Sequence, residues 1–282
     1  MTVTRVRLEQ LEWAFARGVQ REIPGIEASV EIARPRMERA NALNVRGVST
    51  ADALVAARLY GETAALGTRL GVEELSTEAR SRFAQLIAWC AVPNRDEARQ
   101  RAAALFHELG DELAARNDRD GAAAMWMNSG LSVVEMRNPS GDELIAARNL
   151  LDKALRMRKR NTVDFAYSQL NLAAADLLTL SSRLRRSEHP AAFQEILRAL
   201  DRSAQVFKKH DGPNYRWAYH RSVIDALTQW LEFEIERSEE SLYAASVPEG
   251  FSLPNSIDLS GAGLVRVIAR NPSVLRLSEV PN

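Results

Sequence analysis

Residues 144–180 read LIAARNLLDKALRMRKRNTVDFAYSQLNLAAADLLTL, and their pattern gives the clearest indication of the fold. Its first half places apolar residues at helical spacing, namely Leu144, Ala147, Leu151, Ala154 and Leu155. This pattern predicts an amphipathic helix over residues 142–160. The charged residues of the opposite face are expected to point into solvent, namely Arg148, Asp152, Arg156 and Lys159. Residues 138–142 (NPSGD) precede the helix with turn and cap residues.

After a short turn at residues 160–162, the second half predicts another helix with two adjoining stripes. One stripe holds Ala166, Leu170, Ala173, Leu177 and Leu180, and the other holds Tyr167, Asn171, Ala174 and Leu178. A helix with two such stripes must contact neighbours on two sides. A lone helical hairpin supplies only one neighbour, so we expect this element to belong to a row of stacked helices.

The residue pattern of this stretch resembles that of a known family of helical repeats. Residues 147–155, with small or apolar residues at Ala147, Leu151, Ala154 and Leu155, are similar to the second helix of a tetratricopeptide repeat. Residues 164–173 (DFAYSQLNLA) resemble the first helix of the following repeat, as in the long-helix arrays of bacterial multidomain signalling and defence proteins. The stretch departs from the family at Asp176, where an aromatic residue is usual.

A second copy of the pattern supports a repeat origin. Residues 151–153 (LDK) recur 49 positions later as residues 200–202 (LDR), and residues 165–167 (FAY) recur 52 positions later as residues 217–219 (WAY). Internal similarity near 50 residues indicates repeated helix pairs. Coincidence between amphipathic helices is the alternative explanation.

The rest of the chain predicts further helices. We expect one around residues 8–19, one within residues 25–46 that Pro35 breaks or restarts, one from the Ser49–Asp52 cap to Leu70, and one from Leu75 to Cys90. Helices are also expected over residues 98–116, 120–137, 190–210 and 214–240, with residues 117–121 as a turn. The helices over residues 98–116 and 120–137 form a compact repeat, as its first and second helix. If the repeat continued, residues 142–160 would be a first helix, whereas their pattern resembles a second helix, and the sequence leaves this conflict open.

The predicted fold is all-α, with antiparallel helix pairs stacked as a tetratricopeptide-like right-handed α-solenoid of nine to eleven helices. We expect an N-terminal helical segment over residues 1–95 and the helix-pair array over residues 96–243. Residues 244–282 hold several Pro and Gly residues that break long helices, so we expect an irregular cap or tail there.

The amino-acid composition of the chain argues against several classes of protein. The 37 basic and 37 acidic residues give a formal net charge of zero, which disfavours a nucleic-acid-binding module. A single cysteine, Cys90, indicates a reducing compartment. The N-terminus lacks the apolar stretch of a signal peptide, and no run approaches the ~20 apolar residues that span a bilayer. We therefore expect a cytoplasmic protein that does not enter the membrane.

No catalytic constellation stands out in the sequence. It contains no glycine-rich phosphate loop and no paired Cys or His at metal spacing, so we predict neither cofactor nor metal. Cys90 lies on an apolar stripe and is expected to be a buried thiol. Arg101-x5-His107 and Arg183-x5-His189 match the spacing used by some helical ribonucleases, but two such matches are about what chance gives in an arginine-rich chain.

The resemblance to tetratricopeptide arrays implies a groove, lined by the first helix of each pair, that binds a protein or peptide partner. Six polar or amphipathic residues at such positions are the candidate partner contacts, namely Asn128, Tyr167, Gln169, Asn171, Arg216 and Tyr219. The expected function is therefore a regulatory interaction scaffold in a bacterial signalling or defence system. The alternatives are a helical ribonuclease and the regulatory portion of a larger effector, and an open end of the array would allow a homodimer.

Overall fold

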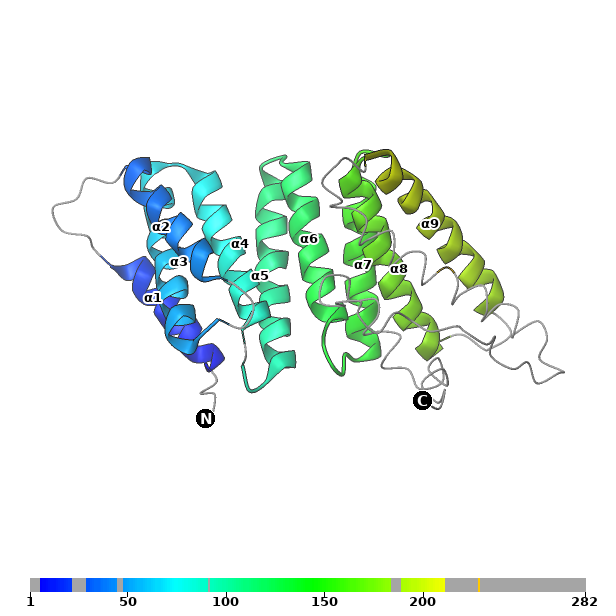
Figure 1. Cartoon of the computed structure of the whole chain (residues 1–282), viewed down its shortest axis with the longest axis horizontal. Coiled ribbons are helices and arrows are strands. Elements are labelled where there is room, and N and C mark those ends of the chain that lie inside the picture. Colours follow the sequence, from blue (N-terminus) through cyan, green and yellow to red (C-terminus); the bar gives the residue numbers. More distant parts are fainter. Residues whose placement is uncertain are drawn as a thin grey trace. The chain divides into compact units, whose positions relative to one another are not determined.

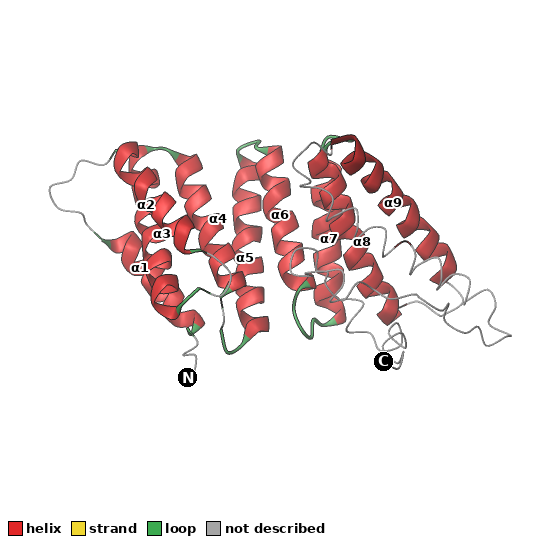
Figure 2. Cartoon of the chain, in the orientation of Figure 1, coloured by secondary structure: helices red, strands yellow, loops and turns green. Residues whose placement is uncertain are grey.

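The computed structural model describes residues 6–21, 29–44, 48–90, 92–183 and 189–210, together with Thr228. These residues form helices and no strand, which confirms the all-α prediction (Figure 2). Figure 1 labels nine helices in this part of the chain: α1 (Leu8–Gln20), α2 (Val30–Leu43), α3 (Thr50–Leu70), α4 (Glu73–Trp89), α5 (Arg95–Ala115), α6 (Arg119–Val134), α7 (Gly141–Met157), α8 (Val163–Arg183) and α9 (His189–His210).

The helices fall into two compact units, which divide after Asn138. The first unit contains α1–α6 and the second contains α7–α9. Within the units, α4 packs on α5, α5 on α6, α7 on α8 and α8 on α9, whereas α3 contacts α1, α2 and α4. The boundary expected after residue 95 falls at the start of α5, inside the first unit. The boundary expected after residue 243 and the helix expected over residues 214–240 lie outside the described residues, apart from Thr228.

Side-chain caps start the helices where the sequence places Ser, Asn and Asp. The Ser49 hydroxyl accepts a hydrogen bond from the Asp52 amide (3.1 Å), and the Asp118 carboxylate accepts one from the Gly121 amide (2.9 Å). Ser140 forms a reciprocal capping box with Glu143 at the start of α7. These bonds satisfy amide groups that the first helical turn leaves without a partner.

Pro35 contradicts the expectation of a break. It lies inside α2, which continues without interruption from Val30 to Leu43. Pro35 has no amide hydrogen, so one carbonyl of the preceding turn loses its intrahelical donor. Because Pro35 is exposed, that carbonyl can be solvated, and buried Ala33, Met37 and Ala40 hold the helix on both sides of the proline.

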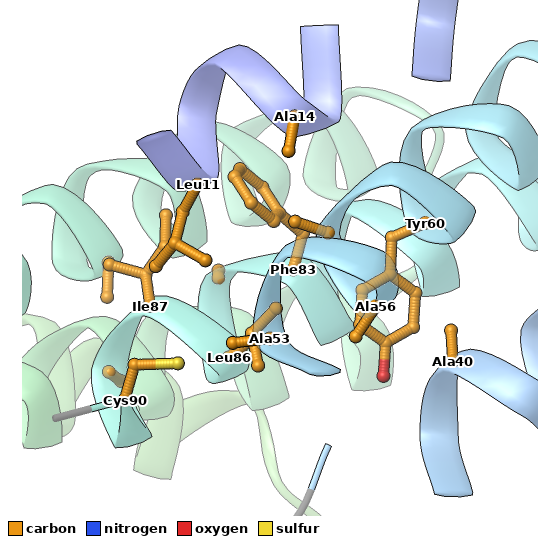
Figure 3. Packing of buried hydrophobic residues seen from close by; sticks show 14 of the residues in the cluster. Leu11, Ala14, Ala40, Ala53, Ala56, Tyr60, Phe83, Leu86, Ile87 and Cys90 are labelled. Carbon is orange, nitrogen blue, oxygen red and sulfur yellow. The ribbon is translucent and has the colours of Figure 1, made fainter. Parts of the chain in front are cut away.

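The core of the first unit joins α1, α3 and α4. Leu11 and Ala14 of α1 point toward Phe83 and Ile87 of α4 in Figure 3, and all four are buried. The ring of Phe15 stacks on that of Phe83 with 4.1 Å between centroids. Each of these residues belongs to an apolar stripe of the sequence, so burial of the stripes sets how these helices meet.

Two glycines bring α1 and α3 into backbone contact. A Cβ on Gly61 would lie 2.1 Å from the Phe15 carbonyl oxygen, and one on Gly18 would lie 2.1 Å from the Arg58 carbonyl oxygen. Neither position can take a side chain unless the two helices separate. The contact therefore fixes the distance between α1 and α3 and the placement of the arginines beside it.

The second unit buries the predicted stripes of three helices. Leu144, Ala147, Leu151 and Ala154 of α7 are buried, as are Ala166, Leu170 and Ala173 of α8 and Phe193, Ile196, Leu200 and Phe207 of α9. Asn161, with a positive φ of 64°, makes the turn between α7 and α8. This unit also buries several polar side chains of α8 and α9.

Candidate functional site

A pocket of about 760 Å³ lies among α7, α8 and α9. Aliphatic side chains from all three helices line part of it, namely Ile145, Leu155, Leu172 and Ile196. Polar side chains line the rest, among them Arg148, Asn149, Gln169, Asp176, Arg198 and Arg202. We call this site the α7–α9 pocket. Its mixture of apolar walls and hydrogen-bonding groups is typical of binding sites.

An ion pair links α7 to α8 within the pocket. The Arg148 Nε donates to Asp176 Oδ1 at 2.5 Å. Burial raises the pKa of Asp176 above its ordinary value, although the Arg148 charge and hydrogen bond act in the opposite direction. The Arg148 side chain is 42% exposed, in line with the expected solvent-facing position, but its guanidinium also reaches across to Asp176, because α8 packs beside α7.

Gln169 connects α8 to α9 at the pocket wall. Its side chain is buried, and its amide lies 3.2 Å from the Ser203 hydroxyl. When the amide nitrogen faces α9, it donates to Ser203 Oγ and to the Ala199 carbonyl (3.3 Å), while the amide oxygen accepts from Arg202 (3.3 Å). This arrangement satisfies both ends of the amide and holds Arg202 at the pocket.

The pocket also carries charged and polar groups that a ligand can reach. Arg198 is exposed on α9 and forms no ion pair with any residue that the structure describes. Asn149 of α7 and Glu195 of α9 are exposed as well. Glu195 contributes to the raised pKa of Asp176, so its charge acts on the interior of the pocket. An amide, a cation and an anion are therefore available around an aliphatic wall.

The structure places the sequence-predicted contacts at different positions. Gln169 lines the α7–α9 pocket, whereas Tyr167 is half-buried on α8 and does not line it. Asn171 is fully buried, and neither its amide nitrogen nor its amide oxygen has a hydrogen-bond partner in the part of the chain that the structure describes. Asn128 lies half-buried on α6 in the first unit. Arg216 and Tyr219 lie outside the described residues.

The Arg-x5-His pairs are not assembled into a shared site where the side chains are described. Arg101 pairs with Glu12 of α1 at 2.5 Å, and His107 lies 3.4 Å from Asp111 one turn along α5. Six residues apart on one helix, the two side chains leave it in different directions. The side chains of Arg183 and His189 lie outside the described part of the chain.

Cys90 confirms the expectation of a buried thiol. It is 3% exposed, and burial raises the pKa of its thiol to about 11. Such a group stays protonated at neutral pH and is a poor nucleophile.

Sequence reasoning missed Asp176, Arg148, Arg198 and Arg202 as pocket residues. Of these four residues, only Asp176 could have been noticed in the sequence, because it is a carboxylate at a position where the resembling family usually has an aromatic residue. The arginines resembled ordinary solvated helix positions, and their role depends on which helix packs beside them.

Among the described residues, no helix is long and apolar enough to cross a membrane, and no group of three or more His, Cys, Asp or Glu residues is arranged to hold a metal ion. Comparison with known proteins identified no family, since no family model, curated protein or solved structure matches the chain.

Proposed function

We propose that this protein is a regulatory binding module, and that the α7–α9 pocket holds an extended segment of a protein partner. The observation that supports the proposal is the pocket itself, where aliphatic Leu172 and Ile196 lie beside polar groups from three helices. An extended segment presents side chains that need an apolar surface and backbone groups that need hydrogen bonds. The Asn149 amide can both donate to and accept from such a backbone.

The architecture adds to the proposal. We further propose that the consecutive helix pairs are repeats of the tetratricopeptide kind, stacked as a right-handed solenoid. Packing of α5 on α6 and of α7 on α8 is what such repeats require. Because the sequence resembles arrays of bacterial signalling and defence proteins, we propose that the bound partner belongs to a system of that type.

The charges of the pocket favour a segment with a carboxylate. Asp176 already has Arg148 as its counterion, and the Gln169 oxygen can hold Arg202 in place. Arg198 is left as a cation at the exposed side of the pocket. We expect a carboxylate of the partner to pair with Arg198 while an apolar side chain contacts the aliphatic wall.

Selection from a random peptide library displayed on phage tests the proposal, with the full chain as bait. Ala199→Trp fills the pocket and should weaken binding of the selected peptides about tenfold or more. Arg198→Glu reverses the exposed charge and should weaken peptides that contain a carboxylate. The matched controls are Ala146→Trp, on an exposed α7 position outside the pocket, and Lys208→Glu, on an exposed α9 position outside it.

Melting curves of each variant separate loss of binding from loss of folding, and Arg198→Glu changes an exposed side chain that the core does not need. The proposal is overturned if the selected peptides bind Ala199→Trp and Arg198→Glu as tightly as the wild type. It is equally overturned if the library yields no binder while a small metabolite occupies the pocket.

A further inference from the structure

Helix α1 carries an exposed aromatic side chain beside a second pocket. Trp13 is 61% exposed, and Val19 of the same helix is 42% exposed. Among the large apolar side chains that the structure describes, these two are the exposed ones. Single exposed apolar residues are common on protein surfaces, so Trp13 is informative only because of its surroundings.

The pocket beside Trp13 lies between α1 and α3 of the first unit and has a volume of about 630 Å³. We call it the α1–α3 pocket. Its wall is aliphatic at Leu54 and Val55 of α3, and Arg17, Arg21 and Arg58 surround this wall. None of its lining residues is acidic, in contrast to the α7–α9 pocket, which contains Asp176 and Glu195.

Among the described residues, the arginines of this pocket retain a net positive charge. One buried carboxylate, that of Glu62, contacts Arg21 at 2.8 Å and Arg58 at 3.6 Å, and it also contacts Arg36 of α2 at 3.1 Å. A single carboxylate shared among three guanidinium groups does not neutralise them, and Arg17 is not among its partners. Because the whole chain has a formal net charge of zero, this local excess is a property of the pocket.

Trp13 is held in place by its neighbour. The guanidinium carbon of Arg17 lies 4.8 Å from the centroid of the Trp13 ring, within the range of a cation–π interaction. The close backbone contact at Gly18 and Gly61 fixes α1 against α3 and so fixes both walls of the pocket. A rigid aromatic group that is already ordered loses little conformational entropy when a partner binds.

We propose that the α1–α3 pocket binds an acidic segment of a protein partner, with an apolar side chain of that segment on Trp13, Leu54 and Val55. Carboxylates of the segment then pair with Arg17 and Arg58, whose charges the pocket does not neutralise. This charge complementarity selects an acidic partner. Leu54 and Val55 form an aliphatic wall that accommodates an apolar side chain, which a protein segment supplies and RNA does not. This second binding surface goes beyond the function proposed for the α7–α9 pocket.

Fluorescence anisotropy with labelled peptides tests the proposal on the full chain. The probe is a library of peptides of about twelve residues, which span about 18 Å as a helix, with Glu or Asp interspersed with Phe or Leu. A second library with Lys in place of the acidic residues is its matched counterpart. We expect the acidic library to bind, the basic one not to bind, and added salt to weaken the binding.

Four variants locate the binding site. Trp13→Ala should weaken binding of the acidic peptides about tenfold, and Arg17→Glu should weaken it further. Val19→Ala removes the other exposed apolar side chain of α1, and Arg34→Glu reverses an exposed charge on α2 outside the pocket; both should leave binding unchanged. Both Trp13 and Arg17 are exposed, so their replacement should not disturb the core.

The proposal is overturned if neither library binds, if both libraries bind equally, or if Trp13→Ala and Arg17→Glu bind the acidic peptides like the wild type. A single-stranded oligouridine probe tests the alternative that the pocket binds nucleic acid. If the oligouridine binds at the same arginines and the acidic peptides do not, the pocket serves nucleic acid and the proposed acidic partner is wrong.

Discussion

The two units of the chain treat their buried polar groups differently. In the first unit, the buried Glu62 carboxylate contacts three arginines, and the buried Tyr60 hydroxyl donates to Asn41 at 2.9 Å. The buried Asn44 amide nitrogen donates to the Tyr60 hydroxyl at 3.1 Å, while its oxygen has no partner among the described residues. In the second unit, α8 buries Ser168, Gln169 and Asn171, and neither end of the Asn171 amide has a hydrogen-bond partner among the described residues. A buried amide without a partner destabilises a fold, whereas a paired group does not.

The first unit has the features of a structural scaffold, and the second unit contains the candidate site. Close glycine contacts and a large shared apolar core hold α1, α3 and α4 together. Helices α7, α8 and α9 enclose a pocket whose walls include a partly buried ion pair. A pocket is a departure from close packing, and such departures are expected where a protein binds something, since those positions are not selected for stability alone.

The largest expected effect is at the glycine contact of the first unit. Gly61→Ala places a Cβ 2.1 Å from the Phe15 carbonyl oxygen, so α1 must move away from α3. We expect a loss of about 3 kcal/mol in the free energy of unfolding, measured by urea denaturation. Gly141→Ala is the control, because a Cβ there meets nothing within 4 Å. A Gly61→Ala variant as stable as the wild type would show that the two backbones are not in contact.

Removal of the Glu62 charge should have the next largest effect. Glu62→Gln leaves Arg21, Arg36 and Arg58 without their shared carboxylate, and we expect a loss of about 2 kcal/mol because the arginines are themselves partly exposed. Glu38→Gln, on an exposed position of α2, should change stability by less than about 0.5 kcal/mol. Equal effects of the two substitutions in urea denaturation would contradict the assignment of Glu62 as a shared counterion.

Replacement of Asn171 in the second unit should change the stability in the opposite direction. Asn171→Leu replaces a buried amide that has no partner among the described residues with an apolar side chain of the same branched shape, and we expect a gain of about 1 kcal/mol in the free energy of unfolding. Ser203→Ala removes a hydroxyl that does have partners and should instead cost about 1 kcal/mol. A clear loss of stability in Asn171→Leu would mean that the amide is satisfied in solution.

The smallest effects concern pH, and the two units should differ in sign. Burial raises the pKa of Asp176, so this group stabilises the fold when protonated, and its contribution is lost as the pH rises above about 3.8. A hydrogen bond from Arg80 lowers the pKa of Glu112, so this group stabilises the fold above about pH 4.5, and its contribution is lost as the pH falls through that value.

Denaturation curves recorded from about pH 3 to about pH 7 measure both contributions. Relative to the wild type, Asp176→Asn should become more stable as the pH rises, and Glu112→Gln should become less stable. Parallel trends in the two variants would contradict the difference in burial between the two ion pairs.

Most of the helices could be predicted from the sequence, because apolar spacing and cap residues are local signals. The helix that begins after Ser49 and the turn at Asn117, with a φ of 63°, follow from such signals. Pro35 misled the prediction because the sequence does not show that its side of α2 faces solvent. The ion pair of the half-exposed Arg148 was missed for a related reason, since its partner Asp176 lies on the neighbouring helix α8.

The candidate sites were predictable only in part. Gln169 was identified because the resembling family places a groove on that face, and the same reasoning also selected Asn171, which is buried. No local pattern predicted the α1–α3 pocket, because the sequence does not show that Gly18 and Gly61 let α1 and α3 approach closely and so bring Trp13 and Arg58 to one surface. Pairings between distant helices are the information that local patterns lack.

Site-specific photo-crosslinking tests the proposed function most directly. A benzophenone amino acid at Asn149, which lines the α7–α9 pocket, should crosslink a peptide selected by the wild-type chain, and the same group at exposed Ala146, one turn away and outside the pocket, should not. Crosslinking from Ala146 as efficient as from Asn149, or from neither position while the peptide is bound, would contradict a partner segment in this pocket.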